Sequence, residues 1–212
     1  MIRGITVVGW LAAGVLGAGA VAQAQQESQG PKPLALGDAA PLADVAMMNV
    51  DGHETTIAGA HGAKGTLVVF TCNACPWAKA WHTRIVSLGN RCVKQGIGVI
   101  AINSNDPGVV PEDGYKVMQT NARRSKMAFP YVVDATSDVA RAFGATRTPE
   151  AFLFDREGKL VYHGTIDDNA KQPDQVKERY LQDAVQAVVD GREIALAETK
   201  ALGCGIKFRS KT

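Results

Sequence analysis

Cys72 and Cys75 are separated by two residues, and they stand where an apolar run at 66–70 gives way to a helical pattern. A thiol at the N-terminus of a helix faces unpaired backbone N–H groups and the positive end of the helix dipole. Both features favour the thiolate, which is the nucleophile in disulfide exchange. A second thiol one turn along the helix can attack the mixed disulfide that the first one forms. This placement predicts a dithiol redox centre at Cys72 and Cys75.

The same pair of cysteines has two other readings. A Cys-x-x-Cys pair is half of a structural zinc site, but such a site needs a second Cys or His pair at similar spacing. The other two cysteines and the four histidines are scattered along the chain. A purely structural disulfide across so short a loop would gain little chain entropy. Redox chemistry is therefore the favoured interpretation, with metal binding and a structural disulfide as alternatives.

Four further residues are candidates for roles near this pair. Cys92 falls on the apolar face of the predicted helix, which is typical of a buried core thiol. Cys204 lies between two glycines in a C-terminal segment without periodic pattern, which we expect to be flexible. It is a candidate third redox thiol, or a disulfide partner of Cys92. His82, two turns after Cys75, lies near the site or on the surface, and His163 with the two thiols would give a copper-type ligand set.

The N-terminal 24 residues have the pattern of a signal peptide. Arg3 is followed by an uncharged apolar run, and Ala22-Gln23-Ala24 is a small-x-small cleavage site. The run is nearly long enough to span a bilayer, so an uncleaved anchor is the alternative. Residues 25–36 are polar, contain two prolines and are predicted to be disordered. The expected organisation is a signal peptide at 1–24, this short segment, and one domain at 37–212 in a periplasmic or secreted protein.

Composition excludes several classes of protein. The formal net charge is +2, which gives no reason to expect a nucleic-acid partner or binding to an anionic membrane after cleavage of the signal. Four cysteines are too few for a disulfide scaffold in an exported chain of this size.

The periodicity of the remaining sequence predicts an α/β domain. Asp51-Gly52 is a strong hairpin signal between two short strands, and a second hairpin surrounds Arg156-Glu157-Gly158. Alternating strands and helices indicate parallel strands at the centre of a layered domain, with chemistry at their carboxyl ends, where Cys72 falls. Strands are expected at 45–50, 53–57, 66–71, 97–102, 129–133, 151–155 and 159–162, and helices at 75–95, 112–126, 137–143 and 175–190.

A strand followed by Cys-x-x-Cys and a helix, with a later Thr148-Pro149 and a closing hairpin and helix, resembles the thioredoxin superfamily. The long segment between Cys75 and Pro149 resembles the redoxin branch, which includes peroxiredoxins and exported thiol–disulfide proteins. Separate blocks at 72–77, 103–106, 148–150, 166–168 and 203–207 are similar to a peroxiredoxin-like group of that branch. The resemblance implies a thioredoxin-like fold, with a central mixed sheet flanked by helices, an N-terminal hairpin and a redoxin-type insertion.

The resemblance also implies roles for individual residues. Cys72 would be the exposed attacking thiol and Cys75 the resolving thiol. Thr148 and a cis Pro149 would face them and bind substrate together with Trp77. The implied function is exported thiol–disulfide oxidoreduction of protein or small-molecule disulfides and thiols, with an unidentified electron donor and no cofactor.

The sequence departs from both better-known patterns of the superfamily. Thioredoxins carry Trp before the first Cys and Gly-Pro between the two, whereas this chain has Thr71 and Asn73-Ala74. Peroxiredoxins place Thr or Ser three residues before the reactive Cys, whereas Thr71 lies four residues before Cys75. A thiol peroxidase acting on hydroperoxides is therefore the second hypothesis, and a copper-binding or copper-delivery protein is the third. Glu150, Asp167 and Asp168 are candidates for tuning the site or accepting protons, with solvated loop carboxylates as the default expectation.

Overall fold

The structure is a computed structural model that describes residues 1, 2, 4 and 33–210. Most of the predicted signal peptide and most of the segment at 25–36 lie outside the described residues. At the start of the domain, Leu34 donates its N–H to the Phe143 carbonyl oxygen at 3.2 Å and packs on the core. No helix among the described residues is both long and apolar enough to cross a membrane.

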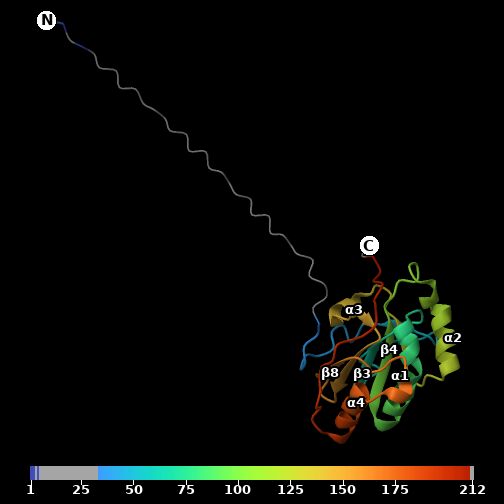
Figure 1. Cartoon of the computed structure of the whole chain (residues 1–212). Coiled ribbons are helices and arrows are strands. Elements are labelled where there is room, and N and C mark those ends of the chain that lie inside the picture. Colours follow the sequence, from blue (N-terminus) through green and yellow to red (C-terminus); the bar gives the residue numbers. More distant parts are fainter. Residues whose placement is uncertain (3, 5–32, 211–212) are drawn as a thin grey trace.

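The centre of the fold is a mixed β-sheet (Figure 1). β4 and β5 run parallel, whereas β3 and β7 are antiparallel. β3 and β4 lie side by side, and just beyond β3 the N–H of Thr71 donates to the Ile102 carbonyl oxygen at 2.9 Å. Across the sheet the strands follow the order β2 (Glu54–Thr55), β1 (Met47–Asn49), β5 (Tyr131–Val133), β4 (Ile97–Asn103), β3 (Gly65–Phe70), β7 (Glu150–Asp155) and β8 (Leu160–Gly164).

Helices cover both faces of this sheet (Figure 1). Side chains of α1, α2 and α4 share one buried cluster, and side chains of α3 belong to the cluster on the opposite face. The helices are α1 (Pro76–Gln95), α2 (Tyr115–Ser125), α3 (Asp138–Phe143) and α4 (Tyr180–Asp190), with short 3₁₀ turns η1 (Pro111–Asp113) and η2 (Pro173–Gln175).

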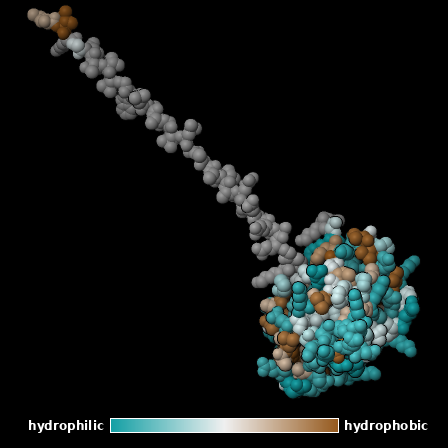
Figure 2. Space-filling view, in the orientation of Figure 1, coloured by the Kyte–Doolittle hydropathy of each residue, from teal (hydrophilic) through white to brown (hydrophobic). Residues whose placement is uncertain are grey.

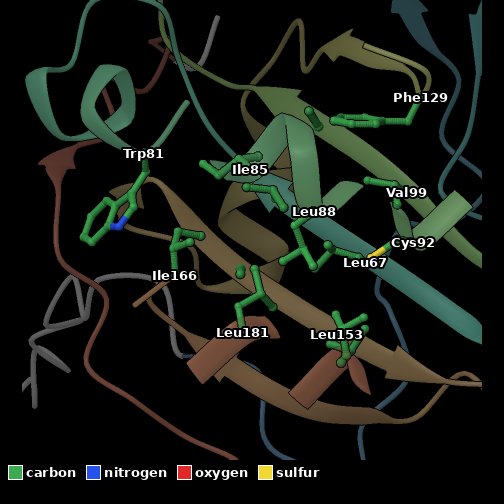
Figure 3. Close-up of a cluster of buried hydrophobic side chains, with 14 of the residues drawn as sticks. Leu67, Trp81, Ile85, Leu88, Cys92, Val99, Phe129, Leu153, Ile166 and Leu181 are labelled. Atoms are coloured by element: carbon green, nitrogen blue, oxygen red, sulfur yellow. The ribbon is translucent and has the colours of Figure 1, made fainter. Parts of the chain in front are cut away.

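Strand periodicity explains the two clusters. In β3, Leu67 and Val69 face one cluster, whereas Val68 and Phe70 face the other. Because successive side chains of a strand point to opposite faces, a strand covered on both sides must be apolar throughout. Figure 3 shows the larger cluster, in which α1 packs Trp81, Ile85, Leu88 and Cys92 against strand residues such as Leu67 and Leu153.

Helix α1 forms where its sequence predicts it. Its apolar residues recur at spacings of three and four, and Pro76 occupies the first turn, where a missing N–H is not a loss. The helix ends at Gly96, which has a positive φ of 88°. Cys75 is the N-cap residue, so the helix N-terminus points at the dithiol.

Two sequence-based expectations are wrong. The last helix begins at Tyr180 instead of residue 175, because Lys177 donates its N–H to the Asp168 carboxylate and Glu178 accepts the N–H of Asp168. The C-terminal segment is also not a free tail. Its strand β9 (Cys204–Gly205) pairs antiparallel with β6 (Arg147–Thr148). This strand was not predicted because its glycine-rich sequence has no apolar alternation and its partner strand lies far away in the sequence.

The face of the domain in view in Figure 2 is mostly hydrophilic, with scattered hydrophobic residues. Single exposed apolar residues of this kind are normal on protein surfaces.

Candidate active site

The loop between β3 and α1 brings Cys72 and Cys75 together at the carboxyl end of a central strand. Both side chains are buried, with exposed fractions of 6% and 4%. The expected exposure of Cys72 is therefore wrong, although its side chain lines a small surface cleft. The two thiols belong to one buried cluster, and each shifts the pKa of the other.

Thr148 contacts both sulfurs from the opposite side. Its hydroxyl oxygen lies 3.2 Å from Cys72 Sγ, and its carbonyl oxygen lies 3.2 Å from Cys75 Sγ. A carbonyl oxygen only accepts, so it binds Cys75 as a thiol, whereas the hydroxyl can donate to Cys72 as a thiolate. Thr148 thus favours the form in which Cys72 carries the charge and Cys75 carries the proton.

The two thiols share one proton. The hydrogen bond between them lowers the pKa of Cys75 to about 4, with further help from the backbone N–H of Ala78, and it raises the pKa of Cys72 together with burial. Because the groups are strongly coupled, the first proton lost belongs to the pair and not to one residue. The site therefore holds a single thiolate near neutral pH, which Thr148 can direct to Cys72.

This arrangement predicts one thiolate per molecule from about pH 5 to pH 8, because the pair titrates at about 4 while Cys204 and Cys92 titrate at about 11 and 12. Ultraviolet absorbance of the reduced chain against pH measures it. The signal should disappear as pH falls through about 4, and Cys72→Ser should move its midpoint upward, since it removes the largest cause of the shift. Cys92→Ser is the control and should leave the curve unchanged. A midpoint near 8.5, the value of an ordinary thiol, would contradict the shared proton.

The Thr148–Pro149 peptide bond is cis, as the resemblance implies. Glu150 supports the turn before it, because one carboxylate oxygen accepts the N–H groups of Thr146 and Arg147, each at 2.9 Å. The other carboxylate oxygen lies 2.7 Å from His163 Nε2. Glu150 is 3% exposed, so its expected place in solvent is wrong.

A buried polar network holds the loop between the cysteines. The N–H of Asn73 donates to Asp113 Oδ1 at 2.5 Å, and its side chain bonds Glu112 O, Asn121 and the Tyr131 hydroxyl. Asp113 is 3% exposed and accepts a second bond from Asn105 Nδ2 at 2.7 Å. Asn73 therefore bonds across to other elements, which fixes the position of the dithiol.

A cleft of about 210 Å³ opens beside Cys72. Its lining includes the polar residues Asn73, Lys79, His82 and Asn121 together with Ala78. Burial lowers the pKa of His82, which favours the neutral imidazole. The structure thus brings His82 to the site, as one of its two sequence readings has it.

The remaining cysteines lie in different places. Cys92 is fully buried in the core, where burial raises the pKa of its thiol to about 12, so the prediction of a core thiol is confirmed. Cys204 lies beside Cys75 and packs on the cluster that contains both site cysteines. A Cys92–Cys204 disulfide is therefore not the arrangement of this fold. Trp77 is half-buried, its ring is tilted against that of Trp81, and it packs on the same cluster as Cys204.

The copper-type set of two thiols and His163 is not assembled here. His163 binds Glu150 and stacks on Phe152, with ring centroids 4.4 Å apart. Across residues 33–210, no three His, Cys, Asp or Glu side chains are grouped so as to hold a metal ion. The third sequence hypothesis therefore has no structural support in this part of the chain.

Sequence reasoning missed three residues that hold the site, namely Asp113, Asn121 and Tyr131. Asp113 falls in a segment that reads as a polar, solvated helix, and Tyr131 reads only as a strand residue. Their partners lie 40 to 58 residues away, so no local pattern marks them.

Comparisons with known proteins identify the family and the fold of the chain. The family model described as Redoxin matches residues 35–180. The thiol-disulfide oxidoreductase ResA of Geobacillus thermodenitrificans is 27% identical over 138 residues, which cover 63% of this chain and 72% of that protein. A solved structure of a hypothetical protein from Sinorhizobium meliloti 1021 is 33% identical with a TM-score of 0.78, covering 85% of this chain and 98% of the other. The fold is also that of peroxidoxin BcpB from Mycobacterium tuberculosis, with a TM-score of 0.55, 14% identity, and coverage of 74% and 96%.

Proposed function

The chain belongs to the redoxin family and is an oxidoreductase of thioredoxin fold, and on that premise we propose that it exchanges thiols and disulfides through Cys72 and Cys75. The observation that carries the proposal is the pair of cysteines clustered at the N-terminus of α1, held against both polar groups of Thr148. A thiolate in a fixed position with a second thiol in contact is what reversible disulfide exchange requires.

The proposed reaction begins at Cys72, because its side chain lines the cleft. With Thr148 donating to it, the Cys72 thiolate attacks one sulfur of a substrate disulfide and releases the other as a thiolate. Cys75 then loses its proton to that leaving thiolate and attacks Cys72 Sγ, which frees the second substrate thiolate and forms the Cys72–Cys75 disulfide. Two substrate thiols are produced for each dithiol oxidised. In reverse the same pair oxidises substrate thiols.

A second candidate function is reduction of hydroperoxides. The observation that favours it is the low pKa of the thiol pair, since a thiolate is also the group that attacks a peroxide oxygen. Attack would give a sulfenic acid on one cysteine, and the other would displace water to form the same disulfide. In both functions the protein ends with the same Cys72–Cys75 disulfide, and only the compound that oxidises the dithiol differs.

Export forms part of the proposal. The charged start, apolar run and small-x-small site of residues 1–24 support translocation into an oxidising compartment, where a dithiol needs an electron donor to act as a reductase. Protein or small-molecule disulfides are then the proposed substrates.

The experiment that tests the proposal is a redox titration of the chain against glutathione buffers, followed by alkylation of free thiols and mass analysis. We expect a reversible two-electron couple in which a Cys72–Cys75 disulfide forms. A low potential would indicate a reductase, and a high potential would indicate an oxidant, because about 30 mV changes the equilibrium tenfold. Failure of the pair to form any disulfide would overturn the proposal.

A further inference from the structure

The C-terminal strand β9 lies along β6, directly beside the cis peptide at Pro149. The register places Cys204 opposite Thr148, and the N–H of Ile206 donates to the Thr146 carbonyl oxygen at 3.0 Å. An extended chain that adds to a strand edge by main-chain hydrogen bonds is a common way of binding a peptide. Here the added strand is the chain's own, and it carries a cysteine to the dithiol.

The docking of this segment is built in detail. A Cβ on Gly203 would lie 2.2 Å from the Thr148 carbonyl oxygen, so only glycine lets the backbone rest on that peptide. Beyond the strand, Ile206 is buried, with 8% exposed. The N–H of Lys207 donates to Asn105 Oδ1 at 2.8 Å, and its carbonyl oxygen accepts the N–H of Asp106 at 2.7 Å.

A continuous chain of hydrogen bonds joins the docked segment to the loop between the cysteines. Asn105 accepts from Lys207 and donates to Asp113, which in turn accepts the N–H of Asn73. The position of the C-terminal segment is thus tied to the position of the dithiol by buried groups. These hydrogen bonds therefore fix the position of Cys204 beside the dithiol.

Three sulfurs gather in one small cluster as a result. The cluster contains Cys72 and Cys75, and the half-buried side chain of Cys204 packs against it. Both Cys72 and Cys204 act on the pKa of Cys75, so Cys75 lies within reach of each. Thiol–disulfide exchange needs the attacking thiol beside the sulfur that it attacks, and the cluster provides that proximity.

We propose, on the basis of the proposed dithiol centre, that Cys204 is a third redox thiol that occupies the place of a substrate thiol and forms a disulfide with Cys75. In the exchange, Cys204 loses its proton and attacks Cys75 Sγ of the Cys72–Cys75 disulfide. The Cys75–Cys204 bond forms, the Cys72–Cys75 bond breaks, and Cys72 leaves as a thiolate that takes up the proton. No electrons are gained or lost, so the exchange needs no added oxidant.

The exchange has a functional consequence at the cleft. Cys72 is released as a free thiol lining the cleft while the protein still stores the disulfide between Cys75 and Cys204. The oxidised protein can therefore engage a second sulfur compound at Cys72 before it is reduced.

Disulfide mapping of the whole chain tests the proposal. The reduced chain is oxidised with glutathione disulfide, quenched with acid, alkylated with N-ethylmaleimide, digested and analysed by mass. Four proteins are compared: wild type, Cys72→Ser, Gly203→Ala and Gly205→Ala. The last is a matched control, because a Cβ on Gly205 has its nearest neighbour 4.0 Å away, at the Thr146 carbonyl oxygen.

We expect wild type and Gly205→Ala to contain both Cys72–Cys75 and Cys75–Cys204 disulfides. Cys72→Ser should form Cys75–Cys204 alone, with loss of Cys204 alkylation on oxidation. Gly203→Ala should lose the Cys75–Cys204 disulfide and keep Cys72–Cys75. Absence of Cys75–Cys204 from wild type, or its undiminished presence in Gly203→Ala, overturns the inference while Cys72–Cys75 survives. Failure of both disulfides to form in wild type overturns the proposed function as well. Should Cys72→Ser not fold, the wild-type and glycine results decide.

Discussion

Replacing Cys72 by serine is expected to lower kcat/KM for reduction of a model disulfide on the order of 1000-fold, because it removes the sulfur that accepts the substrate. A hydroxyl at this position would still accept or donate a bond at Thr148, so the fold and the loop geometry should survive. The loss is then chemical and not structural. Measurement requires steady-state kinetics with an excess of a chemical reductant, together with a thermal unfolding curve for each variant.

Cys92→Ser is the matched control for this substitution, since Cys92 is a fully buried core thiol outside the site. It is expected to cost some stability and to keep activity. The same variants separate the two candidate functions: hydroperoxide turnover that is lost in both Cys72→Ser and Cys75→Ser, beside weak disulfide exchange in the wild type, would favour the peroxidase. Near-normal activity in Cys72→Ser with none in Cys75→Ser would show that Cys75 accepts the substrate and that the assigned roles are wrong.

Much of the fold could be predicted because the sequence patterns that mark its strands, helices and hairpins are local. The strand before Cys72 and the helix after it are marked by a change of period and by Gly96, which ends α1. Both hairpins were also predicted, and β1 with β2 and β7 with β8 confirm them. The start of α4 was misplaced because bonds between Asp168 and residues 177–178 compete with helix formation, and no periodic pattern records such bonds.

Only the central residues of the site could be predicted from the sequence. Cys72, Cys75 and Thr148-Pro149 carry motifs, and the structure brings them into contact. The groups that hold them in place lack any such mark: Asp113 binds Asn73 across 40 residues of sequence, and a short glycine-rich segment becomes a strand only because β6 offers it an edge. The burial of carboxylates was predicted least well, because it depends on hydrogen-bond partners that are distant in the sequence.

Asp167→Ala is expected to lower the free energy of unfolding by about 3 kcal/mol, because it leaves the half-buried Arg84 cation without its counter-ion and a buried indole N–H without its acceptor. Asp167 Oδ1 accepts the Trp81 Nε1–H at 2.7 Å, and Oδ2 binds the guanidinium of Arg84. The carboxylate is 5% exposed and the Arg84 side chain 23%, so solvent can replace the carboxylate only in part. Denaturant unfolding should show the loss as a lower midpoint, and thermal unfolding as a decrease of roughly 6–12 °C.

Asp168→Ala, at the neighbouring position, is the control for this loss. Asp168 is exposed and accepts only the backbone N–H of Lys177, so its replacement should cost less than about 1 kcal/mol. Asp167→Asn should fall between the two, since its amide oxygen can still accept from Trp81 while Arg84 loses its counter-ion. Equal effects of the two alanine variants would contradict the structural role of Asp167. Because Trp81 lies two turns into α1, whose N-cap is Cys75, the same bond fixes the helix that presents the dithiol. Asp167→Ala should therefore also weaken the proposed exchange at Cys75, and the stability loss should appear even when all four cysteines are kept reduced.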